Sequence, residues 1–539
     1  MRRTRTGKTG PPSVRAKQRI RTQPAAAARN VATARPSGGG AATGPRVRIR
    51  MYRQGLGDCF LVTFQPDTPE QAHVLIDMGT IGRGDGVPMS DVVDDIVKTT
   101  HGRLRAVVAT HEHLDHLSGF PQLAEAGVRA DEAWLAWTED PSDALAKRIV
   151  KYRGDLHAAV QQSAIAIDDQ QRERRREREV AAKDDPAGAR EEKERDAHLD
   201  AINEGIRELL RFQGLVPKEG TEDEPLAAMA ARAGGLKKTA DDLMASVREL
   251  AGRRARFLSP GDVFERAWAP GVRFFVLGPP RDLEAIQRLG GHGSPDLYEL
   301  AFVVDAKLPA APGAPLDGET HDSWEPFDHE YMHAFGEEAA ALGGVAAAYE
   351  AERWRKIDEG KAGAAAELAL QLDNATNNTS LVLAIEVAGE VLLFPADAQL
   401  GSWLTWPEVR FEVRENGRKR TVRGEQLLRR TTFYKVGHHG SHNATSKPGL
   451  EMMGERGLTA FIPLDEGVAR RREWPMPARS LHRRLLEKTR GRVIKSDKDA
   501  TQMPGIRVER LYVEVTLPAR PDQRAGTGVD AERRELMPA

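Results

Sequence analysis

The segment between Thr110 and Phe120 holds the chain's densest set of side chains that bind metal ions. Three histidines and two carboxylates fall within six residues, in the order His111, Glu112, His113, Leu114, Asp115 and His116. Neutral imidazole and carboxylate suit zinc, manganese or iron, and the lack of cysteine here disfavours a structural zinc site. Because alternate side chains of a loop can point to one side, His111 and His113 are expected to share one metal ion. Asp115 and His116 are expected to reach a second metal ion beside it.

The elements around this segment are expected to form a layered core. The apolar run "LRAVVAT" (104–110) predicts a buried strand that ends at the histidines. Further strands are predicted at 47–52 and 73–79, within 379–398 as a pair joined by a turn near Ala388 and Gly389, and in 432–442, 458–464 and 510–517. Helices are predicted at 90–100 and 478–491. Strands that alternate with helices favour an α/β or α+β fold.

The spacing His-x-His-x-Asp-His resembles the metal motif of the metallo-β-lactamase superfamily. Asp77 in "LIDMG" resembles the strand-end aspartate that braces the metal loop, and Asp397 in "LLFPADA" matches the carboxylate that bridges two metal ions. "FYKVGHHGS" resembles the last metal-histidine motif, in which His438 is the first candidate and His439 the second. The resemblance covers about 46–135, 272–305 and 377–517. It implies a four-layer αββα sandwich with two divalent metal ions, zinc first, with manganese or iron as alternatives.

A closer resemblance is to the soluble metallo-hydrolase domain of ComEC-type competence proteins. It rests on "GLGDCFLV", "NNTSLVL" and "KVGHHGS", and the sequence from "WPMPARS" to "SDKD" is also similar to that group's ending. The chain departs from the superfamily before "SLVLAIEV", where a lone metal histidine is usual and "LDNATNNTS" stands instead. Asp373, Asn374, Asn377, Asn378 or a water is expected to take its place. ComEC-type sequences also tend to have asparagines there, and Asn377 and Asn378 are expected to support the site.

Composition changes along the chain predict seven segments. Residues 1–45 contain no acidic residue and are expected to form a disordered basic arm. The core is expected at 46–138, with core strands and loops at 259–320 and its second part at 377–520. A charged helical insertion is predicted at 139–258, where it offers a surface for a partner protein, and a second helical insertion at 321–376. Residues 521–539 are expected to form a flexible tail.

The two-metal site implies hydrolysis by a metal-activated hydroxide. Metal binding lowers the pKa of water toward about 7 and offsets charge on a scissile phosphate. Asp115 is expected to orient the hydroxide, and His439 or His442 to protonate the leaving group. Asp58 and Thr110 are expected to support the site, while the Lys435 side chain is expected to lie off the metal face. The ComEC-type resemblance implies phosphodiester substrates, DNA among them, and the basic arm fits a polyanion.

Three other functions remain open from the sequence. Lactam, lactone or thioester bonds would use much the same metal ions. The chain could also be a degenerate hydrolase that acts as a binding or scaffold protein. The segment "HEYMH" (329–333) matches the H-E-x-x-H pattern of zinc peptidases, with His329 and His333 as ligands and Glu330 as base, or it is an amphipathic insertion helix.

Net charge, cysteine content and the length of apolar runs limit the partners and the cellular location that the sequence predicts. Its 539 residues carry a formal net charge of −1, so overall charge does not mark a nucleic-acid binder. The single cysteine, Cys59, is expected to be a buried structural thiol, and it allows no intramolecular disulfide. The sequence has no apolar run of about 18 residues and no secretory h-region, so no membrane span is predicted and a cytoplasmic location is expected.

Overall fold

The computed structural model describes residues 46–181, 236–288 and 368–517, except for 83, 253, 416, 456, 473 and 499–502. Within the segments between these ranges it describes only residues 205, 207, 211, 213, 296 and 297. All of these belong to one unit, Gly44–Ala539. The expected basic arm, the "HEYMH" segment and the tail at 521–539 lie outside the described residues. None of the described helices is long and apolar enough to cross a membrane.

The first large sheet is mixed. Its strands run in the order β16 (Ile506–Val508), β17 (Tyr512–Leu517), β1 (Val47–Tyr52), β2 (Cys59–Phe64), β3 (Ala72–Met78), β4 (Arg103–Val108), β5 (Arg129–Ala136) and β6 (Ala255–Leu258). The pairs from β16 to β3 are antiparallel, and those from β3 to β6 are parallel. The last residues of the expected insertion therefore add an edge strand, β6, to this sheet.

The second large sheet is also mixed. Its order is β15 (Val493–Lys495), β14 (Thr459–Ile462), β13 (Thr431–Lys435), β10 (Glu390–Phe394), β9 (Val382–Val387), β8 (Val272–Gly278) and β7 (Val263–Glu265). The pairs from β15 to β10 are parallel and those from β10 to β7 antiparallel. The predicted turn between β9 and β10 is confirmed, because Ala388 and Gly389 have φ angles of 51° and 84°. A separate hairpin pairs β11 (Arg410–Glu415) with β12 (Arg418–Arg423).

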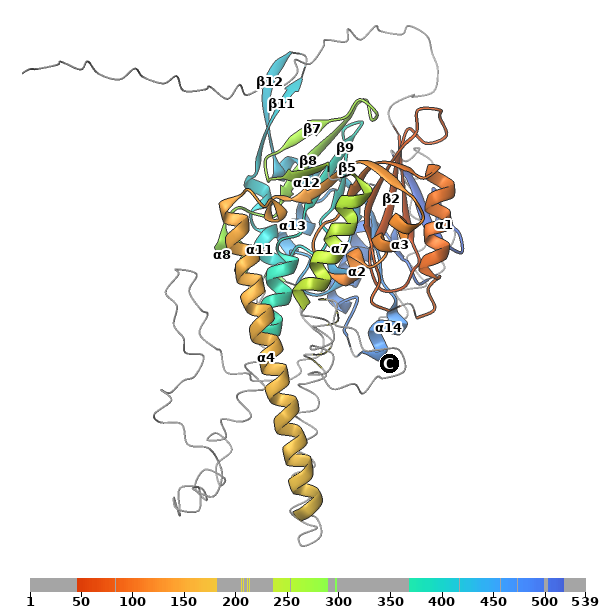
Figure 1. Ribbon diagram of the computed structural model, residues 1–539. Coiled ribbons are helices and arrows are strands. Elements are labelled where there is room, and N and C mark those ends of the chain that lie inside the picture. Colours follow the sequence, from red (N-terminus) through yellow and green to blue (C-terminus); the bar gives the residue numbers. More distant parts are fainter. Residues whose placement is uncertain are drawn as a thin grey trace, which may run out of the picture. The chain divides into compact units, whose positions relative to one another are not determined.

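Apolar residues from both large sheets meet in one cluster. Val62 of β2 and Val74 of β3 belong to it, together with Phe274 of β8 and Ile385 of β9. A side chain on every second residue of these strands reaches this cluster because successive side chains of a strand point to opposite faces. The two sheets therefore pack face to face, as their strands suggest in Figure 1.

Helices cover the other faces of the sheets. The first sheet packs in one cluster with α1 (Met89–Thr100), α3 (Phe120–Glu125) and α7 (Leu236–Leu250). The second packs in another with α12 (Gly424–Arg429), α13 (Lys447–Met452), α14 (Glu466–Arg471) and α15 (Arg479–Thr489). The fold is therefore mixed α/β, and the predicted helices at 90–100 and 478–491 are confirmed. Because Met244, Val247 and Leu250 of α7 are buried in the first of these clusters, the end of the expected insertion is part of the core.

Candidate metal centre

The candidate ligands follow the carboxyl ends of parallel strands. Asp77 stands at the end of β3, and the loop from Thr110 to α2 (Leu114–Leu117) follows its parallel neighbour β4. In the second sheet, Asp397 follows β10, and the 3₁₀ turn η6 (Gly437–Gly440) follows the parallel strand β13. Parallel neighbours end at the same edge of a sheet, where α/β proteins place their sites. The two sheets therefore bring the motifs from distant parts of the sequence to one place.

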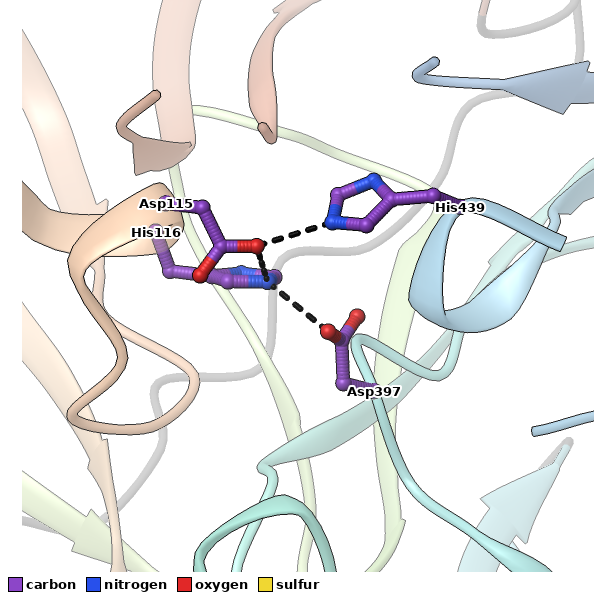
Figure 2. Close-up of side chains that lie close together, drawn as sticks. All are labelled: Asp115, His116, Asp397 and His439. Atoms are coloured by element: carbon purple, nitrogen blue, oxygen red, sulfur yellow. Dashed lines mark hydrogen bonds and ion pairs between the residues drawn. The ribbon is translucent and has the colours of Figure 1, made fainter. Parts of the chain in front are cut away.

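Asp115, His116, Asp397 and His439 form a buried group whose ligand atoms all lie within 4.8 Å of one another. Nε2 of His439 is 2.8 Å from Oδ2 of Asp115. Nε2 of His116 is 3.1 Å from Oδ2 of Asp397 and 3.6 Å from Oδ2 of Asp115. Figure 2 shows the four side chains pointing toward one another from three separate segments. Two imidazoles and two carboxylates around one point suit a divalent cation.

His111 and His113 form a second pair beside this group. Nε2 of His111 is 3.1 Å from Nδ1 of His113, and the rings of His111 and His116 have centroids 4.2 Å apart. Burial lowers the pKa of His111 well below its ordinary value and that of His113 to about 3. Both imidazoles are therefore neutral at neutral pH, which is the form that binds metal ions.

Asp77 orients the metal loop. Its Oδ1 accepts the backbone N–H of Thr110 at 2.9 Å, and its Oδ2 accepts the Thr110 hydroxyl at 2.7 Å. Nδ1 of His116 lies 2.8 Å from the same Oδ2. A carboxylate on Nδ1 fixes the imidazole so that Nε2 is left to face Asp115 and Asp397, the arrangement common behind metal-binding histidines.

The two histidines of η6 differ from the expected order. Nε2 of His439 belongs to the four-residue group, whereas the ring of His438 does not. Both residues have left-handed backbones, with φ of 44° and 53°. That conformation turns the His438 backbone N–H toward Oδ1 of Asp397, at 3.0 Å, and Nδ1 of His439 toward the carbonyl of Pro463, at 2.6 Å. His442, the other predicted proton donor, is half-buried and lies outside the group.

Lys435 corrects another expectation. Its side chain was expected off the metal face, but its Nζ lies 2.5 Å from Oδ2 of Asp58 and 3.2 Å from Oδ1 of Asp397. It also donates to the carbonyl of Ala396 at 3.0 Å. Burial lowers the pKa of the ammonium, but the two carboxylates outweigh it and leave the pKa raised. Asp58 and Asp397 are both buried and need a compensating cation, which explains why the lysine turns inward.

The segment that lacks the usual histidine places one carboxylate near the histidine pair. Oδ1 of Asp373 is 3.8 Å from Nε2 of His113, and Oδ2 accepts the Asn377 amide at 3.0 Å. Burial raises the pKa of Asp373 to about 8. Asn378 instead donates to the carbonyl of Ile286 and accepts the backbone N–H of Gln399. Asp373 therefore stands behind His113, on the side away from His111, while Asn378 secures the backbone.

Gln213 reaches the same nitrogen of His113 from the charged insertion. Its side-chain amide lies 2.7 Å from Nε2 of His113 at one end and 3.2 Å from Nε2 of His157, in α4 (Ala144–Ala181), at the other. The amide oxygen and nitrogen can exchange places by a flip, so the oxygen can accept a proton from Nε2 of His113. No feature of the sequence distinguishes Gln213 from the other glutamines of the insertion.

A buried ion cluster joins α4 to the metal loop. Arg153 lies 3.3 Å from Oε2 of Glu112 and 3.1 Å from Oε1 of Glu139, and it donates to the Thr379 hydroxyl at 3.0 Å. Its side chain is 3% exposed, so water screens these contacts little. Glu112, which separates the two histidines of the pair, thus holds the first helix of the insertion.

The electrostatics of the four-residue group favour a bound cation. Burial alone would lower the pKa of His116, but the surrounding carboxylates, Asp397 and Asp115 first, raise it well above its ordinary value. Burial would raise the pKa of Asp397, yet His116 and Lys435 hold it well below the usual range. Among the described residues, none donates a hydrogen bond to the buried Oδ1 of Asp115. The residues present therefore fit a divalent metal ion.

No family model matches the chain, and no curated protein matches it in sequence.

Proposed function

We propose that the chain is a metal-dependent hydrolase of the metallo-β-lactamase superfamily that acts on phosphodiesters. The observation that carries the proposal is the convergence of Asp115, His116, Asp397 and His439 beside the His111–His113 pair. The superfamily's αββα sandwich is the proposed fold. It is supported by the three apolar clusters, one between the sheets and one between each sheet and its helices.

The proposed metal ligands divide between two sites. His111 and His113 would hold the first metal ion, and Asp115, His116 and His439 the second, with Asp397 between them. Zinc is the first expectation, with manganese or iron as alternatives, because all three accept imidazole and carboxylate. Two bound divalent cations would supply a hydroxide at neutral pH and stabilise charge on the scissile phosphate.

The residues around the ligands have proposed roles of their own. Asp77 and the carbonyl of Pro463 hold His116 and His439 through Nδ1, so that each Nε2 faces the site. Gln213 does the same for His113 through Nε2, which leaves Nδ1 toward His111. Burial raises the pKa of Asp58, which Lys435 opposes, and Lys435 together with His116 holds the pKa of Asp397 below its usual range. Since we assign His439 to the ligands, His442 is the remaining one of the two predicted candidates for protonating the leaving group.

Metal quantification combined with a substrate panel tests this function. The wild-type protein is expected to bind two divalent ions per chain at neutral pH and to hydrolyse phosphodiesters or DNA in a panel with lactams and thioesters. The double variant His113→Ala with Asp115→Ala is expected to lose all turnover. His482→Asn, at a buried histidine of α15 outside the centre, is the matched control and keeps its activity.

Three results would contradict parts of the proposal. Turnover that survives in the double variant would refute the mechanism. A wild-type protein that binds no metal ion at neutral pH would favour a binding or scaffold protein. Turnover of lactams or thioesters, with none of phosphodiesters, would keep the metal centre and reject the substrate class.

A further inference from the structure

The β11–β12 hairpin concentrates positive charge, although the positive and negative charges of the whole chain nearly cancel. Its residues 410–423 include six cationic and two acidic side chains, whereas the whole chain has a formal net charge of −1. The hairpin forms its own two-stranded sheet, and it contacts β7 at the edge of the second large sheet (Figure 1). Residues 410–423 form the basic hairpin.

One face of the basic hairpin packs on the core and the other carries cations. Phe411, Val413 and Val422 are buried in the cluster of the second sheet. Because side chains alternate along a strand, Arg410 and Arg414 point to the opposite face and are exposed. Packing of the buried face therefore determines which side chains of the hairpin are exposed. The register of the two strands determines which exposed side chains lie opposite each other.

That register places like charges directly opposite each other. Arg410 pairs with Arg423, and Arg414 pairs with Lys419. Directly opposed like charges destabilise a pair of strands. Arg423 is compensated by Glu408, whose two oxygens both lie 2.6 Å from its guanidinium. Among the described residues, none forms an ion pair with Arg414 or Lys419. Glu412, on the same face, instead accepts the Thr421 hydroxyl at 2.7 Å.

We propose that the basic hairpin is a DNA-binding surface that holds a polymeric substrate at a distance from the metal centre. Phosphates of a DNA backbone would lie between the opposed cations and remove the repulsion that the free hairpin carries. A two-stranded ribbon also has the width that the major groove admits. The identification of the bound DNA as the substrate rests on the proposed hydrolase function; the binding itself does not.

The basic hairpin lies at the end of the second sheet away from the metal centre. Glu415 binds Arg273, near the start of β8, at 3.1 Å. Gly278, at the other end of β8, pairs with Val382, and the neighbouring Leu381 donates its backbone N–H to Thr110 of the metal loop. The length of β8 separates the two by roughly 17 Å, the rise of about five base pairs. Only a substrate of several nucleotides would therefore reach both.

The double variant Arg414→Gln with Lys419→Gln tests the proposal in the full-length protein. Its affinity for a 20-base-pair DNA duplex, measured by fluorescence anisotropy with a chelator to prevent turnover, is expected to fall on the order of tenfold at low salt. The slope of log affinity against log salt is expected to fall by about 2, one for each lost phosphate contact. The melting temperature is expected not to fall, because the variant removes a repulsion.

A matched control removes two exposed cations elsewhere. Lys98→Gln in α1 with Arg129→Gln at the start of β5 makes the same charge change and is expected to leave DNA affinity nearly unchanged. With an active enzyme, the hairpin variant is expected to raise KM for the duplex and to leave turnover of a small phosphodiester, bis(p-nitrophenyl) phosphate, unaltered.

Several outcomes would overturn the inference. The hairpin variant could have the same DNA affinity and the same salt slope as the wild type. The control variant could lose as much DNA affinity as the hairpin variant does. The protein could also bind anionic lipid vesicles more tightly than DNA. Each can occur while metal content and turnover remain as proposed. Conversely, if the protein bound DNA through the basic hairpin but bound no metal ion, the proposed hydrolase function would be refuted and the proposed DNA-binding surface would stand.

Discussion

Replacing Gln213 with leucine tests whether the insertion is part of the metal centre. The side-chain amide of Gln213 contacts Nε2 of His113 at 2.7 Å, Nε2 of His157 at 3.2 Å and the Thr376 hydroxyl at 3.5 Å. Leucine is close to glutamine in size but makes none of these hydrogen bonds. The change therefore removes the polar support of His113 while keeping most of the volume of the buried side chain.

Two magnitudes follow from these contacts. The contacts to His113 and His157 have ordinary hydrogen-bond lengths, whereas the contact to Thr376 is at the limit. Leaving a buried polar atom without its partner costs about 1–3 kcal/mol, so the loss of these two contacts is expected to lower the free energy of unfolding by about 2–6 kcal/mol. Loss of the partner behind a metal-binding histidine weakens metal affinity by about 10–100-fold. This loss is expected only for the metal ion at His111 and His113.

Chelator competition with metal quantification separates the two sites. Gln213→Leu is expected to keep one tightly bound ion and to weaken the other, whereas Gln213→Glu, which still accepts the proton of Nε2, stays within a few-fold of the wild type. Thr489→Val removes a buried 2.8 Å hydrogen bond of α15 and serves as the control for lost stability alone. Unchanged affinity for both ions in Gln213→Leu would refute a role of Gln213 in positioning His113.

Two further predictions concern buried ionisable side chains. Lys435→Met is expected to lower the free energy of unfolding by about 3–5 kcal/mol without metal, because Asp58 and Asp397 lose their cation. Bound divalent metal is expected to reduce that loss, and an equal loss in urea unfolding with and without metal would contradict this. Burial lowers the pKa of His73 to about 4, below its ordinary value of 6.5. Below pH 6.5 the imidazole of His73 binds a proton more tightly in the unfolded chain than in the folded one. The contribution of His73 to the free energy of unfolding is therefore fully present above pH 6.5. It falls toward pH 4 by up to about 1.4 kcal/mol per pH unit. In urea unfolding between pH 6.5 and pH 4, the free energy of unfolding is expected to fall less steeply with pH in His73→Gln than in the wild type. Equal slopes in the two proteins would contradict the lowered pKa of His73.

The parts of the centre that the sequence predicts are those encoded by short spacing. His111 to His116 occupy one loop, and the apolar run before them places that loop at a strand end. Asp397 is predicted by the resemblance of "LLFPADA" to the superfamily's bridging-carboxylate motif, and it follows the apolar strand β10. Side chains at strand ends converge because the strands are parallel neighbours, and this regularity is visible in the pattern of apolar residues.

The parts that the sequence does not predict depend on contacts between distant segments. The order of His438 and His439 is set by two left-handed residues in η6, which no local preference for histidine specifies. Lys435 turns inward because two buried carboxylates from other segments require a cation. Gln213 is 100 residues from His113, in a stretch whose mixed charges indicate only solvated helices. Local pattern and the family resemblance thus predict the candidate ligands, whereas tertiary charge and hydrogen bonding determine which side chains surround them.

The surroundings of the two proposed metal sites differ in charge. Around His116, burial would raise the pKa values of Asp115 and Asp397, but His116 itself holds both below the usual range, so both carboxylates are ionised. The side chains beside His113 include a neutral imidazole, a neutral amide and the Asp373 carboxyl, whose pKa of about 8 keeps it largely protonated at neutral pH. Since attraction for a divalent cation grows with the negative charge of its ligands, the site at His116 is expected to hold its ion more tightly. Metal binding at the proposed site of His111 and His113 then depends more on the fixed orientation of the two imidazoles. Asp373 and Gln213 of the insertion both lie beside Nε2 of His113 and so act on that orientation.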